Sequence, residues 1–184
     1  MTKARDLASG GFGLVLIKPS TVVNGTDNGK GTVSFSAQTS VSLNDVFSAT
    51  YENYFLLTRI TAMSLGDNIQ IRMRVSGSDD STANYHYLGL RITTTVDRAA
   101  SYSQTSYRIG EATTGKGALQ TVIYGPQLAA VTQFNGFITN GFTNPMENGF
   151  QQGVHNVATA YTGFTLFALS GNMTGNVSVY GYNK

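Results

Sequence analysis

The residues of this chain that could carry out chemistry are few and lie apart in the sequence. Asp79 and Asp80 are adjacent carboxylates that could bind a hard cation, but Ca²⁺ takes roughly six to eight oxygen ligands. The two histidines, His86 and His155, offer little material for a histidine-based metal centre, and there is no cysteine. We therefore expect no metal site, no cofactor and no disulfide.

The glycine-rich residues 24–31 (NGTDNGKG) could suggest a phosphate-binding loop. They lack the Gly-Lys-Ser/Thr ending and the following helix that such a loop needs, so we interpret them as a turn. The chain has no Gly-x-Ser-x-Gly nucleophile motif, and no pair of carboxylates stands out among its 10 acidic residues. The sequence therefore predicts a protein that is not an enzyme.

Aromatic and arginine side chains are the better candidates for recognition. Residues 85–87 (YHY) would give a stacking surface, and residues 93–119 are expected to form long exposed loops around a short strand. Because aromatic rings and arginine dominate contact energies, these residues could bind a sugar or pack between identical subunits, with a slight preference for the subunit contact. The candidates are Tyr85, His86, Tyr87, Arg98, Tyr102, Tyr107 and Arg108.

The elements that must position these side chains are β-strands. Residues 33–43 and 69–76 alternate apolar and polar side chains, and the short apolar run 54–60 is typical of a central strand. We expect three strands in residues 33–76, the last two closed into a hairpin by residues 65–68. A second closing hairpin is expected from the strands 163–169 and 176–182. Further strands are expected at 14–17, 85–92, 119–124, 130–134 and 137–139.

These segments predict an all-β chain with an antiparallel β-sandwich or jelly-roll fold over residues 15–184 as a single domain. About eight to ten strands at roughly 8- to 15-residue spacing are typical of that class. Residues 1–14 contain a Gly-Gly-Phe-Gly break and are expected to be a separate arm. The arm could dock onto a larger structure through Leu7 and Phe12, or it could be a frayed terminus.

The composition of the chain argues against two classes of partner, nucleic acids and membranes. Charged residues make up 12% of the chain, about half the usual share, and the net charge is +2 without a block of like charges. We therefore expect no nucleic-acid partner. No apolar run reaches the roughly 18 residues of a membrane span, and the first residues lack the apolar core of a signal peptide, so we expect no membrane insertion.

Residues 45–54 (DVFSATYENY) are the most specific stretch in the chain. Asp45 is expected to cap one helical turn over residues 46–50, and Phe47, Tyr51 and Tyr54 to plug one end of the sandwich. This string, followed by a strand and the alternating IRMRVSG (residues 71–77), resembles a module of bacteriophage tail-fibre and other virion surface proteins. The opening TKARDLA (residues 2–8) and the ending LSGNMTGNVSVYGYNK (residues 169–184) resemble the same module.

The resemblance implies a virion surface protein that is made in the host cytoplasm and assembled on the phage particle with other capsid or tail proteins. It implies a fibre- or knob-type module that attaches to host surface glycans. The alternative is a capsid decoration protein that stabilises the phage head, because the sequence lacks the heptads or repeats of a fibre shaft.

Self-association is the last expectation from the sequence. Residues 164–169 (FTLFAL) are apolar on both faces, whereas a two-layer sandwich buries one face of each sheet. The candidate interface residues are Phe142, Phe150 and Phe167. We expect a homotrimer, where the number three comes from the resemblance, and a dimer would fit the pattern equally.

Overall fold

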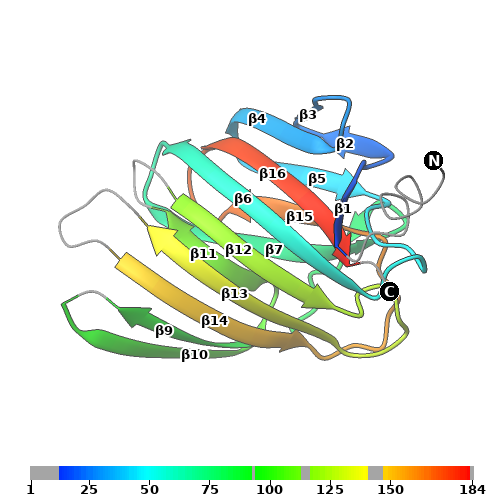
Figure 1. The fold of residues 1–184 in the computed structure, drawn as a ribbon. Helices are drawn as coiled ribbons and strands as arrows, with labels where there is room; N and C mark the ends of the chain where they lie inside the picture. Colours follow the sequence, from blue (N-terminus) through cyan, green and yellow to red (C-terminus); the bar gives the residue numbers. More distant parts are fainter. Residues whose placement is uncertain (1–12, 93, 113–116, 141–146, 183–184) are drawn as a thin grey trace, which may run out of the picture.

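The protein is an antiparallel β-sandwich of two sheets, which confirms the predicted fold class (Figure 1). The computed structural model describes residues 13–92, 94–112, 117–140 and 147–182. Within these ranges every regular element is a strand, and none is a helix that could cross a membrane. The candidate residues Leu7, Phe12 and Phe142 lie outside the described residues.

The large sheet has ten strands in the order β10-β9-β14-β13-β12-β6-β16-β4-β3, with β1 paired to β16. Figure 1 shows β9 and β10 at one edge of this sheet and β3 and β4 at the other. Its strands are β1 (Leu14–Ile17), β3 (Thr26–Asp27), β4 (Thr32–Gln38), β6 (Asn53–Met63), β9 (Tyr85–Ile92), β10 (Val96–Gln104), β12 (Gly117–Tyr124), β13 (Thr132–Asn140), β14 (Glu147–His155) and β16 (Met173–Tyr182).

The small sheet packs against the inner face of the large one. Its strand order is β11-β7-β15-β5-β2, with β8 paired to β7. Its strands are β2 (Thr21–Val23), β5 (Ser40–Asn44), β7 (Asp67–Val75), β8 (Ser78–Asp79), β11 (Tyr107–Ala112) and β15 (Gly163–Ala168).

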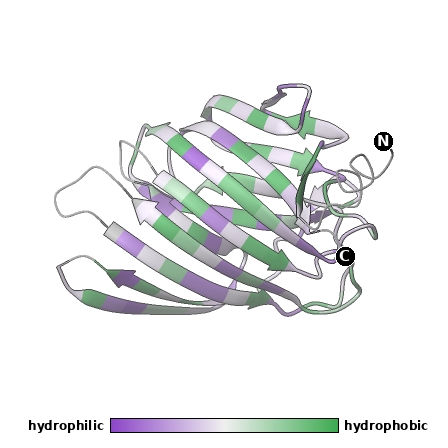
Figure 2. Cartoon of the chain, in the orientation of Figure 1, coloured by the Kyte–Doolittle hydropathy of each residue, from purple (hydrophilic) through white to green (hydrophobic). Residues whose placement is uncertain are grey.

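The core lies between the sheets and follows the two-residue period of the strands (Figure 2). In β12, Leu119 and Ile123 are buried, whereas Gln120 and Tyr124 are exposed on the opposite face. Burying one such aliphatic side chain contributes about 1.5–3 kcal/mol, so the inner face of each strand holds the sandwich together. The outer face of the large sheet is left free to carry other side chains.

Two predicted hairpins are wrong. The strands β6 and β7 that flank residues 65–68 belong to different sheets, and so do β15 and β16, which flank residues 169–172. In each case the chain crosses from one sheet to the other. A short polar turn can join two strands of one sheet in a hairpin, and it can equally carry the chain from one sheet to the other. The local sequence therefore does not distinguish a hairpin from a crossing between sheets.

Strand boundaries also differ from expectation in the middle of the chain. Residues 33–43 form two strands, β4 and β5, because the chain passes from the large sheet to the small one at Thr39. Ala37 (φ 51°) lies just before this point, where the pairing of β4 with β16 is irregular. Residues 93–119 are not mainly loop: β10 and β11 occupy most of the described part. Residues 130–139 hold one continuous strand, β13, that runs through Gly136.

The aromatic plug is confirmed, but the helical turn predicted after Asp45 is not formed. Asp45 has a left-handed backbone (φ 57°) and accepts a hydrogen bond from the Ser20 hydroxyl. The Tyr54 hydroxyl accepts from the Ser48 N–H at 2.6 Å and donates to the Ser48 carbonyl at 2.7 Å, which holds this loop over the core. The rings of Phe47 and Tyr54 contact edge to face, with centroids 4.7 Å apart.

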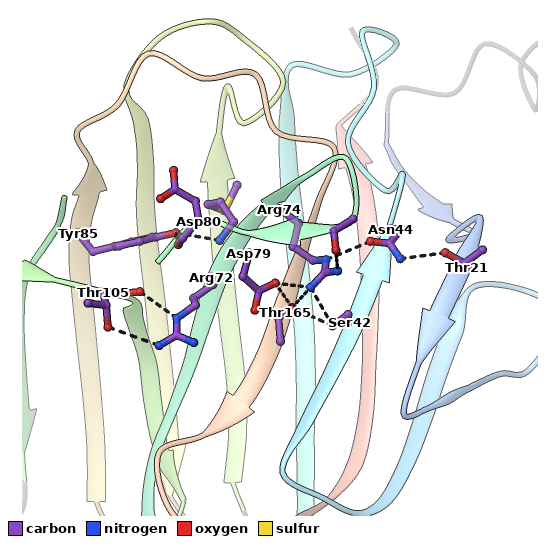
Figure 3. A network of polar contacts seen from close by, with 12 residues as sticks. Thr21, Ser42, Asn44, Arg72, Arg74, Asp79, Asp80, Tyr85, Thr105 and Thr165 are labelled. Carbon is purple, nitrogen blue, oxygen red and sulfur yellow. Dashed lines mark hydrogen bonds and ion pairs between the residues drawn. The ribbon is translucent and has the colours of Figure 1, made fainter. Parts of the chain in front are cut away.

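Polar side chains cover part of the outer face of the small sheet (Figure 3). Arg74 Nη1 donates to Thr165 Oγ1 at 2.7 Å and pairs with Asp79, and its Nε donates to Asn44 Oδ1 at 3.1 Å. This network joins β7, β8, β15 and β5 by side chains as well as by backbone. The ion pair between Arg74 and Asp79 in this network is mostly shielded from water.

Candidate binding site on the outer face of the large sheet

Five neighbouring strands, β12-β13-β14-β9-β10, present rows of side chains on the outer face of the large sheet. Residues directly opposite each other on adjacent strands lie on the same face, so the register defines each row. The first row is Tyr124, Gln133, Val154 and His86. The second row is Val122, Asn135, Gln152, Leu88 and Ala100. The third row is Gln120, Phe137, Phe150, Leu90 and Arg98.

A groove of about 550 Å³ lies over the first two rows and is called groove 1. Tyr102 from the edge strand β10 closes one side of it, with its ring centroid 6.0 Å from that of His86. The Ser103 N–H donates to His86 Nδ1 at 3.2 Å, so the neutral ring carries its proton on Nε2. The side chains that line groove 1 from the outer face are His86, Leu88, Tyr102, Tyr124, Gln133, Asn135, Gln152 and Val154.

The lining combines aromatic rings with side-chain amides. Tyr102 is 65% exposed and Tyr124 is 39% exposed, so both rings offer open faces. The amides of Gln133, Asn135 and Gln152 supply both donors and acceptors. Asn135 Oδ1 is buried and has no hydrogen-bond partner in the described part of the chain. That oxygen is closed off from the groove, so the exposed amides of Gln133 and Gln152 are the ones that a ligand can reach.

A second groove of about 400 Å³, groove 2, lies over the second and third rows. It shares Leu88 and Gln152 with groove 1, so the two grooves are continuous. Leu90 and Phe150 form an apolar floor, and Arg98 from the edge strand β10 lines the side. Groove 2 therefore differs from groove 1 in carrying a charged side chain.

The structure places some of the predicted site residues in these grooves. His86 and Tyr102 line groove 1, and Arg98 and Phe150 line groove 2. Tyr87 touches groove 1 but packs against the core.

The prediction that Tyr85 and Tyr107 lie on the surface is wrong. Both are fully buried, because their positions in β9 and β11 point into the sandwich. Arg108 Nη2 is paired with Glu111 Oε2 at 2.9 Å, which leaves it less able to bind a partner. Phe167 lies on the outer face of the small sheet, where the Arg72 guanidinium covers its ring at 4.7 Å.

Sequence reasoning missed six of the residues that line groove 1 from the outer face: Leu88, Tyr124, Gln133, Asn135, Gln152 and Val154. The alternation in residues 119–124 does place Tyr124 on the face of the strand away from Leu119 and Ile123. That pattern could have identified Tyr124 as a surface residue. The amides carry no such signal, because their proximity depends on the pairing of β12, β13 and β14.

A second cluster of titratable groups lies inside the sandwich, around Asp80. The Tyr161 hydroxyl donates to Asp80 Oδ2 at 2.5 Å, and His155 Nε2 lies 3.7 Å from the same oxygen. Neither ring nitrogen of His155 has a hydrogen-bond partner within the described ranges. His155, Tyr85 and Tyr161 are fully buried, so a substrate has no access to this cluster, and we interpret it as structural.

Electrostatics of the cluster follow from burial. Burial lowers the pKa of His155 below its ordinary value of 6.5, against the opposing effect of the Asp80 charge. Burial alone would raise the pKa of Asp80, but hydrogen bonds from Thr82 and Tyr161 outweigh it and lower that pKa below 3.8. Burial raises the pKa of Tyr85 and of Tyr161. At neutral pH the cluster therefore holds a neutral imidazole beside a carboxylate.

Comparisons with known proteins bear on the fold alone. No family model matches the sequence, and no characterised protein matches it. The SPRY domain of human HERC1 is similar in structure, with 14% identity, a TM-score of 0.43, and coverage of 90% of this chain and 97% of that one. A mutant of the GH43 protein BlXynB from Bacillus licheniformis gives 11% identity, a TM-score of 0.37, and coverage of 83% and 32%. The carbohydrate recognition domain of Emp47p gives 8% identity, a TM-score of 0.31, and coverage of 91% and 96%.

Proposed function

We propose that this chain is a non-enzymatic surface protein of a bacteriophage virion that attaches to host surface glycans through groove 1. The observation that carries the binding site is the set of three rings, His86, Tyr102 and Tyr124, that shares one open groove with three amides. Its place on a virion rests on the sequence resemblance of residues 45–54, 71–77 and 169–184 to phage surface modules.

The chemistry of the groove suits a sugar. One side of a sugar ring presents C–H groups, which pack against an aromatic ring, and its hydroxyls both donate and accept hydrogen bonds. Tyr102 and Tyr124 supply the aromatic faces, and the exposed amides of Gln133 and Gln152 supply donors and acceptors. Side chains on paired strands keep these groups in place before binding, which lowers the entropy cost of association.

We infer that groove 1 binds without cleaving. The described side chains that line it include no Asp or Glu, whereas glycoside hydrolysis usually needs two carboxylates on either side of the bond. The expected result is recovery of host polysaccharide unchanged after incubation with the protein. Release of reducing sugar that one Asp or Glu substitution abolishes would contradict this inference.

The test of the binding site is a pair of matched tyrosine variants. Tyr124 and Tyr182 are both 39% exposed on the outer face of the large sheet, but only Tyr124 lines groove 1. Calorimetric titration with host surface polysaccharide should show about tenfold weaker binding for Tyr124→Ala, the equivalent of about 1.4 kcal/mol, and no change for Tyr182→Ala.

Two outcomes would count against this function. Equal loss in both variants would show that binding does not use groove 1. If the chain bound purified phage heads and no host glycan, it would be a decoration protein. Gold labelling of the chain on intact particles distinguishes these cases further, because a decoration protein covers the head and an attachment protein lies on the tail or at vertices.

A further inference from the structure

We propose that groove 2 is a second subsite, which takes an anionic sugar unit, so that the ligand is an acidic oligosaccharide lying across both grooves. This inference rests on the proposed glycan binding in groove 1 and specifies its ligand. It is carried by the continuity of the two grooves and by Arg98.

The grooves are arranged to hold successive units of one chain. Leu88 and Gln152 line both, so there is no wall between them. Neighbouring rows on one face are two residues apart along each strand, which is a step of roughly 6.6 Å. This step is close to the size of one sugar ring with its linkage. A ligand held by Tyr124 in the first row would therefore lay its next unit over Leu88 and Gln152 in the second row and the following unit over Leu90 and Phe150 in the third.

Arg98 determines the charge of that unit. It lies opposite Leu90 across the β9–β10 pair, and its guanidinium forms no hydrogen bond or ion pair with any described residue. The preceding residue, Asp97, points to the other side of the sheet, because side chains alternate along a strand. The guanidinium is thus available to a ligand, and it binds a carboxylate or a sulfate through two parallel hydrogen bonds.

The rest of groove 2 suits the body of a sugar unit. Leu88, Leu90 and Phe150 form an apolar floor, with the Phe150 ring supported by Phe137 at a centroid distance of 6.0 Å. Gly89 and Ala100 add no bulk beside Arg98. Gln152 at the junction can bond hydroxyls of either unit. An apolar floor with one cation at its side selects a ring that bears a single acidic group.

The test compares three tetrasaccharides: one of galacturonic acid, its methyl ester, and a sulfated galactose tetramer. At low salt the acid or the sulfated tetramer should bind at least tenfold more tightly than the ester, and Arg98→Gln should abolish this preference. The matched control is Arg59→Gln, because Arg59 is an exposed arginine on the same face that lines neither groove.

The outcomes separate the two proposals. If the ester binds as tightly as the anionic tetramers and Tyr124→Ala weakens all three, the acidic subsite is overturned and glycan binding in groove 1 stands. Binding of none of the three overturns both. Equal loss of the preference in Arg59→Gln shows a general charge effect and overturns the subsite. If Arg98→Gln changes the mass of the protein by light scattering, groove 2 is a subunit contact and the inference is also wrong.

Discussion

The ring of His155 lies stacked on the ring of Tyr85, with centroids 3.9 Å apart and planes inclined by 16°. The Tyr85 hydroxyl accepts from the Met73 N–H and donates to the Asp80 carbonyl, both at 2.9 Å. One buried stack therefore connects β14 and β9 of the large sheet to β7 of the small sheet. The stability of this contact between the sheets depends on the protonation state of the His155 imidazole, which is buried away from water.

Acidification should destabilise the fold through His155. Its pKa in the folded state is lowered, so the unfolded chain takes up the proton first, at its ordinary pKa of 6.5. The contribution is fully present above pH 6.5 and is lost as pH falls from 6.5 toward the folded pKa, by up to about 1.4 kcal/mol per pH unit. The measurement is the free energy of unfolding in urea at several pH values between 7.5 and 5.

His155→Phe should keep the ring stack and flatten this pH dependence, because phenylalanine does not titrate. A slope that persists in His155→Phe would show that another group is responsible.

A separate loss of stability is expected below pH 3.8. The pKa of Asp80 is lowered in the fold, so its contribution is present above the ordinary value of 3.8 and is lost as pH falls from 3.8 through the lower pKa of the folded state.

Removal of Arg74 should cost about 1–3 kcal/mol of unfolding free energy. Its side chain is 11% exposed, and substitution by methionine would leave Asp79 and Thr165 without their cation. The control is Lys18→Met, because Lys18 is 63% exposed and its Nζ lies 3.7 Å from Asp27 Oδ2. An exposed pair of that kind contributes little, so the control should change stability by less than about 0.5 kcal/mol. Similar losses in the two variants would contradict the role of the network.

Gly175 should tolerate no side chain. A Cβ at this position would lie 2.1 Å from the Arg59 carbonyl oxygen, at the irregularity where β16 pairs with β6. Gly175→Ala should therefore lower the thermal unfolding midpoint, with a stability loss of about 1–3 kcal/mol from overpacking. Gly13→Ala is the control, because no described atom lies within 4 Å of its Cβ position. An unchanged midpoint for Gly175→Ala would mean that the two backbones can move apart.

The homotrimer stays a prediction, and the structure changes where its contacts are expected. Phe167 is covered by Arg72, whereas Ile92 and Val96, at the edge of the large sheet, are 48% and 65% exposed. Light scattering at micromolar concentration should give a trimeric mass, and the double substitution Ile92→Asp/Val96→Asp should reduce it to a monomer. Phe167→Asp should have no effect, because an aspartate beside Arg72 forms an ion pair. A monomeric mass for the unchanged chain would refute the trimer.

Local sequence was sufficient for the class of fold and for several strands. The alternation in residues 85–92 and the short apolar run 14–17 predict β9 and β1 at the bounds that the structure shows. The plug formed by Phe47 and Tyr54 was also predictable, since large aromatic residues beside a core strand have few other places to pack. These features depend on side-chain period and size, which neighbouring residues determine.

Tertiary structure alone decided which strands pair and which side chains meet. Alternation divides a strand into two faces but does not say which face is inside, so the sequence predicts Tyr85 and Tyr107 on the surface although both are buried. The change of sheet between β6 and β7 depends on their pairing with β12, β16 and β15, far away in the chain. The grooves arise in the same way: backbone hydrogen bonds set the register that brings Tyr124, Gln133 and His86 into one row.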